Sequence, residues 1–210
     1  MTREEIANTI SHGFALILTL IAVPILIAAA ARAGNVPFTV GVSVFGGTMV
    51  LLYLASTLYH SLTHETAKQF FRLFDHTAIF LLIAGTYTPF SLGVLRGPWG
   101  WSMLAAVWAL AIIGIILKIR KRTRHSPIGI VLYVIMGWLA IIAVKPILML
   151  IPVPGILLIL AGGLAYTGGL AFFAAQRIRY NHFIWHLFVI AGTTCHFFAV
   201  LWYAASVNRG

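Results

Sequence analysis

Four residues that could bind a metal ion or move protons stand where long apolar segments of the chain begin or end. His182 and His186 open the last apolar segment, His60 closes the second, and Asp75 opens the third. On a helix, His182 and His186 are one turn apart on the same face, about 6 Å from each other. That spacing suits two ligands of one metal ion. A third imidazole from His60 would complete three protein ligands, as in a catalytic zinc site whose fourth position is open to water.

Two further residues suit chemistry at such a metal. Zinc lowers the pKa of a bound water to about 7. Asp75 is the single aspartate of the chain and could accept the proton of that water or hold the water by a hydrogen bond. Ser56 precedes His60 by one helical turn and could orient a ligand or contact the water. If Asp75 were itself a ligand, two histidines and a carboxylate could instead hold iron(II).

The elements that must position these residues are predicted to be membrane-spanning helices. Of the 210 residues, 61% are hydrophobic and 9% are charged, a composition typical of a polytopic membrane protein. A spanning helix needs about 20 mostly apolar residues. The sequence predicts an all-α integral membrane protein, a seven-transmembrane helix bundle that forms a single domain over 1–210. The predicted spans lie near 12–32, 39–62, 75–95, 99–118, 127–146, 154–175 and 183–205.

Three alternatives to this organisation follow from the same segments. An even number of spans would result if 127–146, which is short and ends at Lys145 and Pro146, is buried or re-entrant. A β-barrel would alternate polar and apolar residues, which these segments do not do. The first segment is treated as a retained span, because Glu4 and Glu5 precede it and its apolar stretch is too long for a signal peptide.

The basic residues predict the orientation of the bundle. With seven spans, ten Lys and Arg residues fall on the side of the N-terminus and four on the other side. The positive-inside rule then predicts a cytoplasmic N-terminus and a C-terminus outside. The run KIRKRTRH at 118–125 is interpreted as a topology determinant that also contacts anionic lipid headgroups, and the net charge of +10 is not taken to indicate nucleic acid.

This topology brings the chemically active residues to one depth. His60, Asp75, His182 and His186 all fall just inside the cytoplasmic boundary, although they come from three different spans. Histidines at a membrane interface are commonly solvated or bonded to backbone carbonyls, so no single one of them indicates a site. Ionisable groups near hydrocarbon are costly and usually have a partner or a task. Their shared depth favours metal binding.

Four motifs in order resemble a known family. The stretches EEIANTISHG, STLYH, FDHTAIFLLIAGTYTPF and HFIWH are similar to those of haemolysin III-type members of the progestin and adipoQ receptor family. The resemblance covers nearly the whole chain and implies a seven-helix bundle in a bacterial cell membrane with zinc near the inner face. It implies that His60, His182 and His186 ligate the zinc, that Asp75 reaches it through water, and that Ser56 lies beside the site.

The resemblance also implies a reaction. The wider superfamily includes alkaline ceramidases, so the sequence predicts a zinc-dependent hydrolase that acts on an amide or ester bond of a membrane lipid. The alternative is a non-enzymatic haemolysin or receptor-like membrane protein with a structural zinc, which influences cytolysis or lipid homeostasis. An ion channel or transporter would need polar residues along a continuous path, and the spans carry almost none beyond the inner face. The substrate and the oligomeric state stay open.

Two other histidines are expected to play packing roles. His196 follows His182 by fourteen residues, about 21 Å along a helix, which is too far to share the metal. It is expected to bond to a neighbouring helix. His12, near the start of the first span, is expected to cap a helix or lock a loop.

Overall fold

The computed structural model describes residues 1–120, 128–175 and 177–204, and within these ranges it contains helices and no strand. In chain order the elements are α1 (Arg3–Arg32), α2 (Val36–Ser61), α3 (Glu65–Pro89), the π-helix η1 (Phe90–Leu95), α4 (Gly97–Ile119), α5 (Ile128–Gly137), the 3-10 helix η2 (Leu139–Ala143), α6 (Val144–Leu150), α7 (Val153–Ala174), α8 (Asn181–Ala199) and the π-helix η3 (Val200–Ala204). Seven helical stretches are long and apolar enough to cross a membrane, which confirms the predicted all-α seven-helix architecture.

Local sequence signals set where the first helices begin and end. The Thr2 hydroxyl caps α1 by accepting a hydrogen bond from the backbone N–H of Glu5 at 3.2 Å. Gly34 follows α1 with a φ of 70°, a left-handed conformation that glycine adopts without strain. The side chain of Asn35 then caps α2 by accepting from the N–H of Phe38 at 3.2 Å. These signals produce a tight reversal between two long antiparallel helices.

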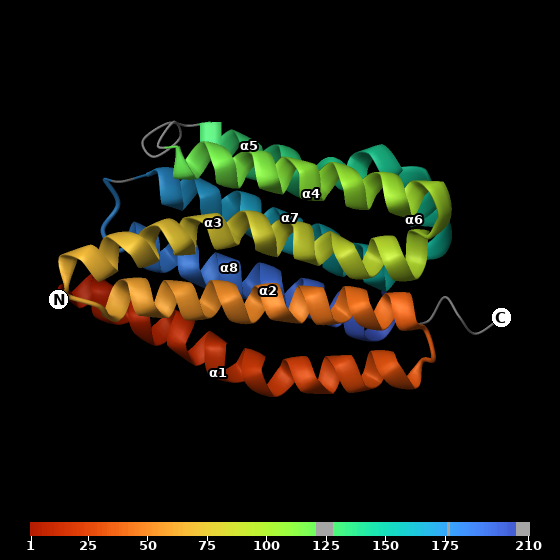
Figure 1. Cartoon of the computed structure of the whole chain (residues 1–210), viewed down its shortest axis with the longest axis horizontal. Coiled ribbons are helices and arrows are strands. Elements are labelled where there is room, and N and C mark those ends of the chain that lie inside the picture. Colours follow the sequence, from red (N-terminus) through yellow and green to blue (C-terminus); the bar gives the residue numbers. More distant parts are fainter. Residues whose placement is uncertain (121–127, 176, 205–210) are drawn as a thin grey trace.

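The helices form a closed ring that brings the first and last helices of the chain together. Helix α2 packs against α1 and α3, α3 packs against α4, and α7 packs against α8. Contact between α1 and α8 closes the ring, so the first and last helices are neighbours. Figure 1 shows α1 and the group of α4, α5 and α6 on opposite sides of the bundle, with α2, α3, α7 and α8 between them.

The fifth span, for which the sequence left open a buried or re-entrant segment at 127–146, is interrupted. The stretch Ile128–Leu150 meets the length and hydropathy of a span, but η2 separates α5 from α6. The Tyr87 hydroxyl of α3 donates to the carbonyl of Gly137 at 2.9 Å and accepts from the N–H of Ala140 at 3.0 Å. One side chain therefore bonds two backbone groups at the break, as a broken helix in a membrane requires.

The structure describes only some of the basic residues on which the predicted orientation depends. The start of α1, the end of α2 and the start of α3 lie at one end of the bundle with the ends of α4 and α7 (Figure 1). Lys118 and Arg120 lie at that end, but most of the predicted headgroup-binding run falls in residues 121–127, outside the described residues. The cytoplasmic placement of this end and its contact with anionic lipids stay predictions.

Candidate metal centre

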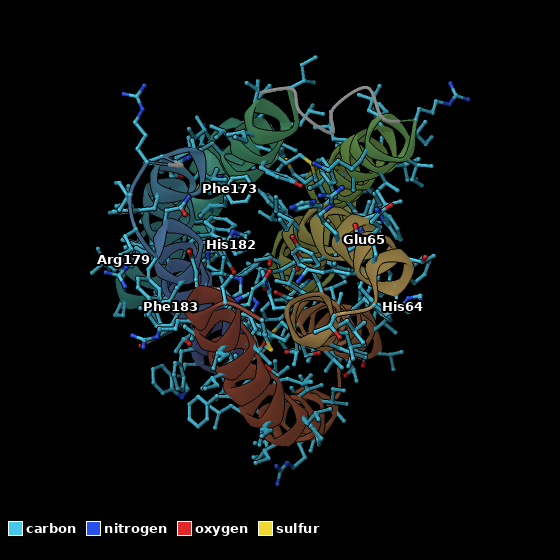
Figure 2. The ribbon with its side chains drawn as sticks, turned by 90° about the vertical axis from the view of Figure 1, so that its left-hand side faces the viewer. His64, Glu65, Phe173, Arg179, His182 and Phe183 are labelled. Atoms are coloured by element: carbon cyan, nitrogen blue, oxygen red, sulfur yellow. The ribbon has the colours of Figure 1, made fainter. Side chains whose placement is uncertain are left out.

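Three histidines from two helices converge at the end of the bundle that carries the start of α1. His60 lies in the last turn of α2, while His182 and His186 lie in the first two turns of α8. Their possible ligand atoms all lie within 4.8 Å of one another. The His60 ring centroid is 5.0 Å from that of His182 and 5.1 Å from that of His186. Seen from this end, His182 points into the space between the helices and Arg179 lies at the periphery (Figure 2).

The unpaired atoms of this histidine cluster, His60, His182 and His186, fit a metal ion. The Nε2 atoms of His60 and His182 are buried and have no hydrogen-bond partner among the described residues. An unpaired polar atom in a membrane interior is costly unless something else binds it. Two nitrogens that each lie about 2.1 Å from one zinc ion are at most about 4.2 Å apart, so the cluster needs only a small inward movement to bind one.

Two of the three imidazoles are bonded through their other nitrogen to α1. The Nδ1 atom of His60 lies 2.6 Å from Oε2 of Glu5, and Nδ1 of His186 lies 3.1 Å from Oγ of Ser11. The second oxygen of Glu5 accepts a hydrogen bond from Nζ of Lys68 at 2.9 Å. Metal-binding histidines commonly donate their other N–H to such a carboxylate or oxygen. In both residues Nε2 is the nitrogen left for a metal.

The expectation that His12 caps a helix or locks a loop is wrong. His12 lies inside α1 and is 2% exposed. Its ring stacks on that of His186, with centroids 3.5 Å apart and planes 7° from parallel. Neither ring nitrogen of His12 has a hydrogen-bond partner among the described residues. His12 is therefore a buried side chain at the edge of the histidine cluster.

Asp75 and Ser56 are not part of the cluster. Asp75 of α3 is 5% exposed, and the group of clustered ligand atoms contains imidazoles alone, without its carboxylate. This favours a three-histidine ligand set over the two-histidine, one-carboxylate set of an iron(II) site. Ser56 is fully buried beside Asp75, but its hydroxyl makes no hydrogen bond of standard geometry within the described residues.

An apolar cavity of about 260 Å³ runs from the cluster through the bundle. At one end Asp75, His182 and His186 line it, and further along Val134, Ile156 and Leu160 do. The cavity passes between α3, the interrupted fifth span, α7 and α8. Small-molecule sites are mostly apolar with a few convergent polar groups, and they commonly measure about 300–1,000 Å³. This cavity lies just below that range, with Asp75 and two of the clustered imidazoles at one end and a few further polar groups, among them Thr86, Thr167 and His196, along its length.

The remaining polar candidates lie outside the histidine cluster. As expected, His196 bonds to a neighbouring helix, with Nε2 3.1 Å from the carbonyl oxygen of Ile159 on α7. His76 lines the cavity, but no metal-binding group of the described residues includes it. Thr86 also lines the cavity and donates its hydroxyl hydrogen to the carbonyl of Leu82 in its own helix at 2.8 Å.

Sequence reasoning missed the contribution of α1. Glu5, Ser11 and His12 all contact members of the histidine cluster. One signal was present: Glu5, Asn8 and His12 follow one another at spacings of three and four, which places them on one helix face ahead of an apolar run. That pattern shows a polar face but not which helix it meets, and only the contact between α1 and α8 decides that.

Comparison with known proteins agrees with this architecture. The sequence profile of a family described as Haemolysin-III related matches residues 1–197. Hemolysin-3 of Bacillus cereus is 49% identical over 201 residues, which cover 96% of this chain and 92% of the relative. The Hemolysin-3 homolog of Bacillus subtilis (strain 168) is 44% identical over 205 residues, which cover 98% of this chain and 96% of the relative.

A more distant relative comes from animals, and no solved structure matches the chain. The human protein called monocyte to macrophage differentiation factor is 26% identical over 163 residues, which cover 75% of this chain and 67% of that protein. The Bacillus relatives and the seven apolar helices together indicate a multi-pass protein of a bacterial membrane. With its profile match over residues 1–197 and two relatives above 40% identity, the chain belongs to the haemolysin-III-related family of membrane proteins.

Proposed function

We propose that this protein is a zinc-dependent hydrolase that cleaves an amide or ester bond of a membrane lipid. The observation that carries the proposal is the junction of two features: a cluster of three buried imidazoles and an apolar cavity that begins at two of them, His182 and His186. A ligand cluster alone would suit a structural metal. A cavity that opens onto it supplies the space that a substrate needs.

In such a reaction, the histidines would bind the metal and Asp75 would transfer the proton. His60, His182 and His186 would hold the metal, which when bound polarises a carbonyl group and acidifies water. Asp75 lines the same cavity and would accept the proton of the attacking water. Hydrolysis forms a bond between the water oxygen and the acyl carbon and breaks the C–N or C–O bond. Asp75 would then return the proton to the leaving nitrogen or oxygen, as a general acid does.

The cavity lining favours a lipid over a water-soluble substrate. Beyond its polar end the cavity is lined mainly by aliphatic and aromatic side chains, including Ile79, Val134, Ile156 and Leu160. An acyl chain placed there would be removed from water, at a gain of about 0.8 kcal/mol per CH₂ group relative to water. The chain would hold its carbonyl end near His182 and His186.

The test uses purified protein in lipid bilayers and separates metal binding from hydrolysis. Wild-type protein should contain zinc and release fatty acid from an amide- or ester-linked lipid, measured by mass spectrometry. His186→Ala should lose both the zinc and the product. Asp75→Asn should keep the zinc and lower the rate of product release about 10²- to 10⁴-fold, the usual contribution of general acid–base catalysis. Unchanged zinc content and unchanged hydrolysis in His186→Ala would rule the proposal out.

A second candidate function comes from the name of a relative. The Bacillus cereus protein is called Hemolysin-3, and the alternative is therefore that this chain lyses membranes without hydrolysing a lipid. In that case the three histidines would hold a metal that serves structure alone. The Asp75→Asn variant separates the two candidates in a red-cell lysis assay. Lysis that stops together with hydrolysis supports the enzyme. Lysis at the wild-type level, with zinc retained and no hydrolysis, supports the non-enzymatic haemolysin.

A further inference from the structure

We propose that Glu5 and Ser11 of α1 are positioning residues of the metal centre, which fix two of its three imidazoles so that their Nε2 atoms face the ion. The inference rests on the metal site of the proposed function, but it does not depend on any reaction there. It assigns a task to the first turns of α1, a helix that supplies none of the three clustered imidazoles.

Glu5 determines which nitrogen of His60 is free. The 2.6 Å separation of Glu5 Oε2 and His60 Nδ1 is that of a strong, charge-assisted hydrogen bond. A carboxylate can only accept, so Nδ1 carries the hydrogen and Nε2 carries the lone pair. That Nε2 is the buried atom with no partner among the described residues. The carboxylate thus fixes the tautomer and the ring direction that a metal ligand needs.

Lys68 holds the carboxylate in place from a third helix. Its Nζ donates to Oε1 of Glu5 at 2.9 Å, while Oε2 faces His60. The side chains of Glu5 and Lys68 are 23% and 25% exposed, so the pair lies at the boundary of the bundle and not in its core. Helices α1, α2 and α3 are therefore connected through one carboxylate, directly behind a ligand nitrogen.

Ser11 determines which nitrogen of His186 is free, as Glu5 does for His60. The Ser11 hydroxyl donates its single hydrogen to the carbonyl oxygen of Asn8 at 2.9 Å, which leaves its lone pairs to accept from Nδ1 of His186 at 3.1 Å. Nδ1 therefore carries the hydrogen, and Nε2 remains for the metal. Within the described residues, His182 has no hydrogen bond of this kind. Its position depends on the packing of α8.

The rest of α1 shows that this polar face is unusual. Along α1, large apolar side chains such as Ile10, Phe14, Ile17 and Ile21 are exposed on the outer surface of the bundle, where lipid would surround them. The inward face is instead polar in its first turns, where Asn8 and His12 are buried, and small or apolar further along. Buried polar residues in a membrane span are costly and usually functional.

The test measures metal affinity in the full-length protein after removal of metal by a chelator. Zinc binding is followed by competition with a chelating dye, and cobalt(II) is used as a spectroscopic substitute. Glu5→Gln keeps the size of the side chain and loses its charge. It should weaken zinc binding about 10- to 100-fold, as loss of such a partner does at other metal sites. It should also shift the cobalt absorption bands, while the melting temperature of the metal-free protein stays unchanged.

Matched controls isolate the effect. Glu4→Gln changes the neighbouring carboxylate, which makes no hydrogen bond or ion pair in the described part of the chain. Ser11→Ala is paired with Ser43→Ala, whose hydroxyl bonds only to the Thr39 carbonyl of its own helix. Both controls should bind zinc as tightly as the wild type, and Ser11→Ala should bind it several-fold more weakly.

The outcomes separate this inference from the proposed function. Wild-type protein that binds neither zinc nor cobalt removes the metal centre itself. Wild-type protein that binds zinc, with equal affinity in Glu5→Gln and Ser11→Ala, overturns the positioning role alone. If Glu5→Gln does not fold, the comparison of Ser11→Ala with Ser43→Ala decides, and equal affinities again overturn the inference.

Discussion

Helix α8 carries two buried histidines, His186 and His196, whose surroundings differ in kind. His186 lies about 15 Å from His196 along the helix axis. Around it lie the imidazoles of His60, His182 and His12 and the hydroxyl of Ser11, and its Nε2 is left for a ligand. His196 is bonded to the Ile159 carbonyl of α7. The same residue type on one helix therefore belongs to a cluster that could hold a metal ion at one end and bonds to a neighbouring helix at the other.

The contrast arises from what faces each side chain. A glycine, Gly162, lies opposite His196, and a Cβ there would stand 2.5 Å from its Nε2, so the ring sits against the backbone of α7. The backbone carbonyl of Ile159 then pairs Nε2, while Nδ1 has no partner among the described residues. His186 faces side chains from α1 and α2 instead, which bring further donors and lone pairs. Both histidines keep one nitrogen without a protein partner, so a buried histidine indicates a metal site only when other ligand atoms lie close enough to share the ion, as they do around His186.

The largest expected effect is on zinc affinity, and it tests the contrast between His186 and His196. His186→Ala should lower zinc affinity by more than about 100-fold, because one of three protein ligands is lost. His196→Ala should leave zinc affinity within about twofold of the wild type. Elemental analysis of the purified proteins, followed by zinc titration, measures both. Equal loss of zinc in the two variants would mean that both histidines act through the fold and that the contrast is incorrect.

A smaller effect should appear in the cavity between the two histidines. Gly163 lines the cavity, and a Cβ added there meets no atom within 4 Å. Gly163→Leu should fill part of the space and lower hydrolysis of long-chain lipids about tenfold relative to short-chain ones, because one to two kcal/mol of chain burial is lost. Gly47→Leu is the control, since its Cβ also meets nothing and it lies outside the cavity. Equal rates for both chain lengths in Gly163→Leu would place the acyl chain elsewhere.

The smallest effect is the stability that His196 contributes. Loss of its bond to Ile159 should lower the free energy of unfolding of His196→Ala by about 0.5–1.5 kcal/mol, the usual net contribution of one such hydrogen bond. Thr194→Ala serves as control, because that exposed hydroxyl bonds only to the Ile190 carbonyl of its own helix. Denaturation of the detergent-solubilised proteins measures the difference. A His196→Ala variant as stable as the wild type would show that the bond contributes nothing to the free energy of unfolding.

The sequence predicted the parts of this protein that depend on local composition. Seven apolar stretches gave seven helices, because the length of an apolar run is a property of the run itself. Alternation of direction along the chain then placed His60, Asp75 and the two histidines of α8 at one end. For the fifth span, the sequence raised only the alternative that 127–146 is buried or re-entrant. It did not predict the interruption, because the backbone groups at the break are bonded by Tyr87 from another helix.

The site was predicted less completely than the fold. The three clustered imidazoles were named in advance, but His12 was assigned to the wrong role, and Glu5 and Ser11 were not recognised as partners of His60 and His186. These contacts span 55 and 175 residues of sequence. No pattern within a single helix specifies which face of a distant helix it will meet.

By itself, the sequence determined that this protein crosses a membrane seven times and delivers imidazoles and a carboxylate to one depth, because a helix that crosses hydrocarbon needs an apolar run of about 20 residues. The tertiary structure alone decided that α1 closes the ring against α8, that Glu5 and Ser11 stand behind two of the imidazoles, and that a cavity opens beside them. Those features depend on how side chains of separate helices fit together, which local composition does not encode.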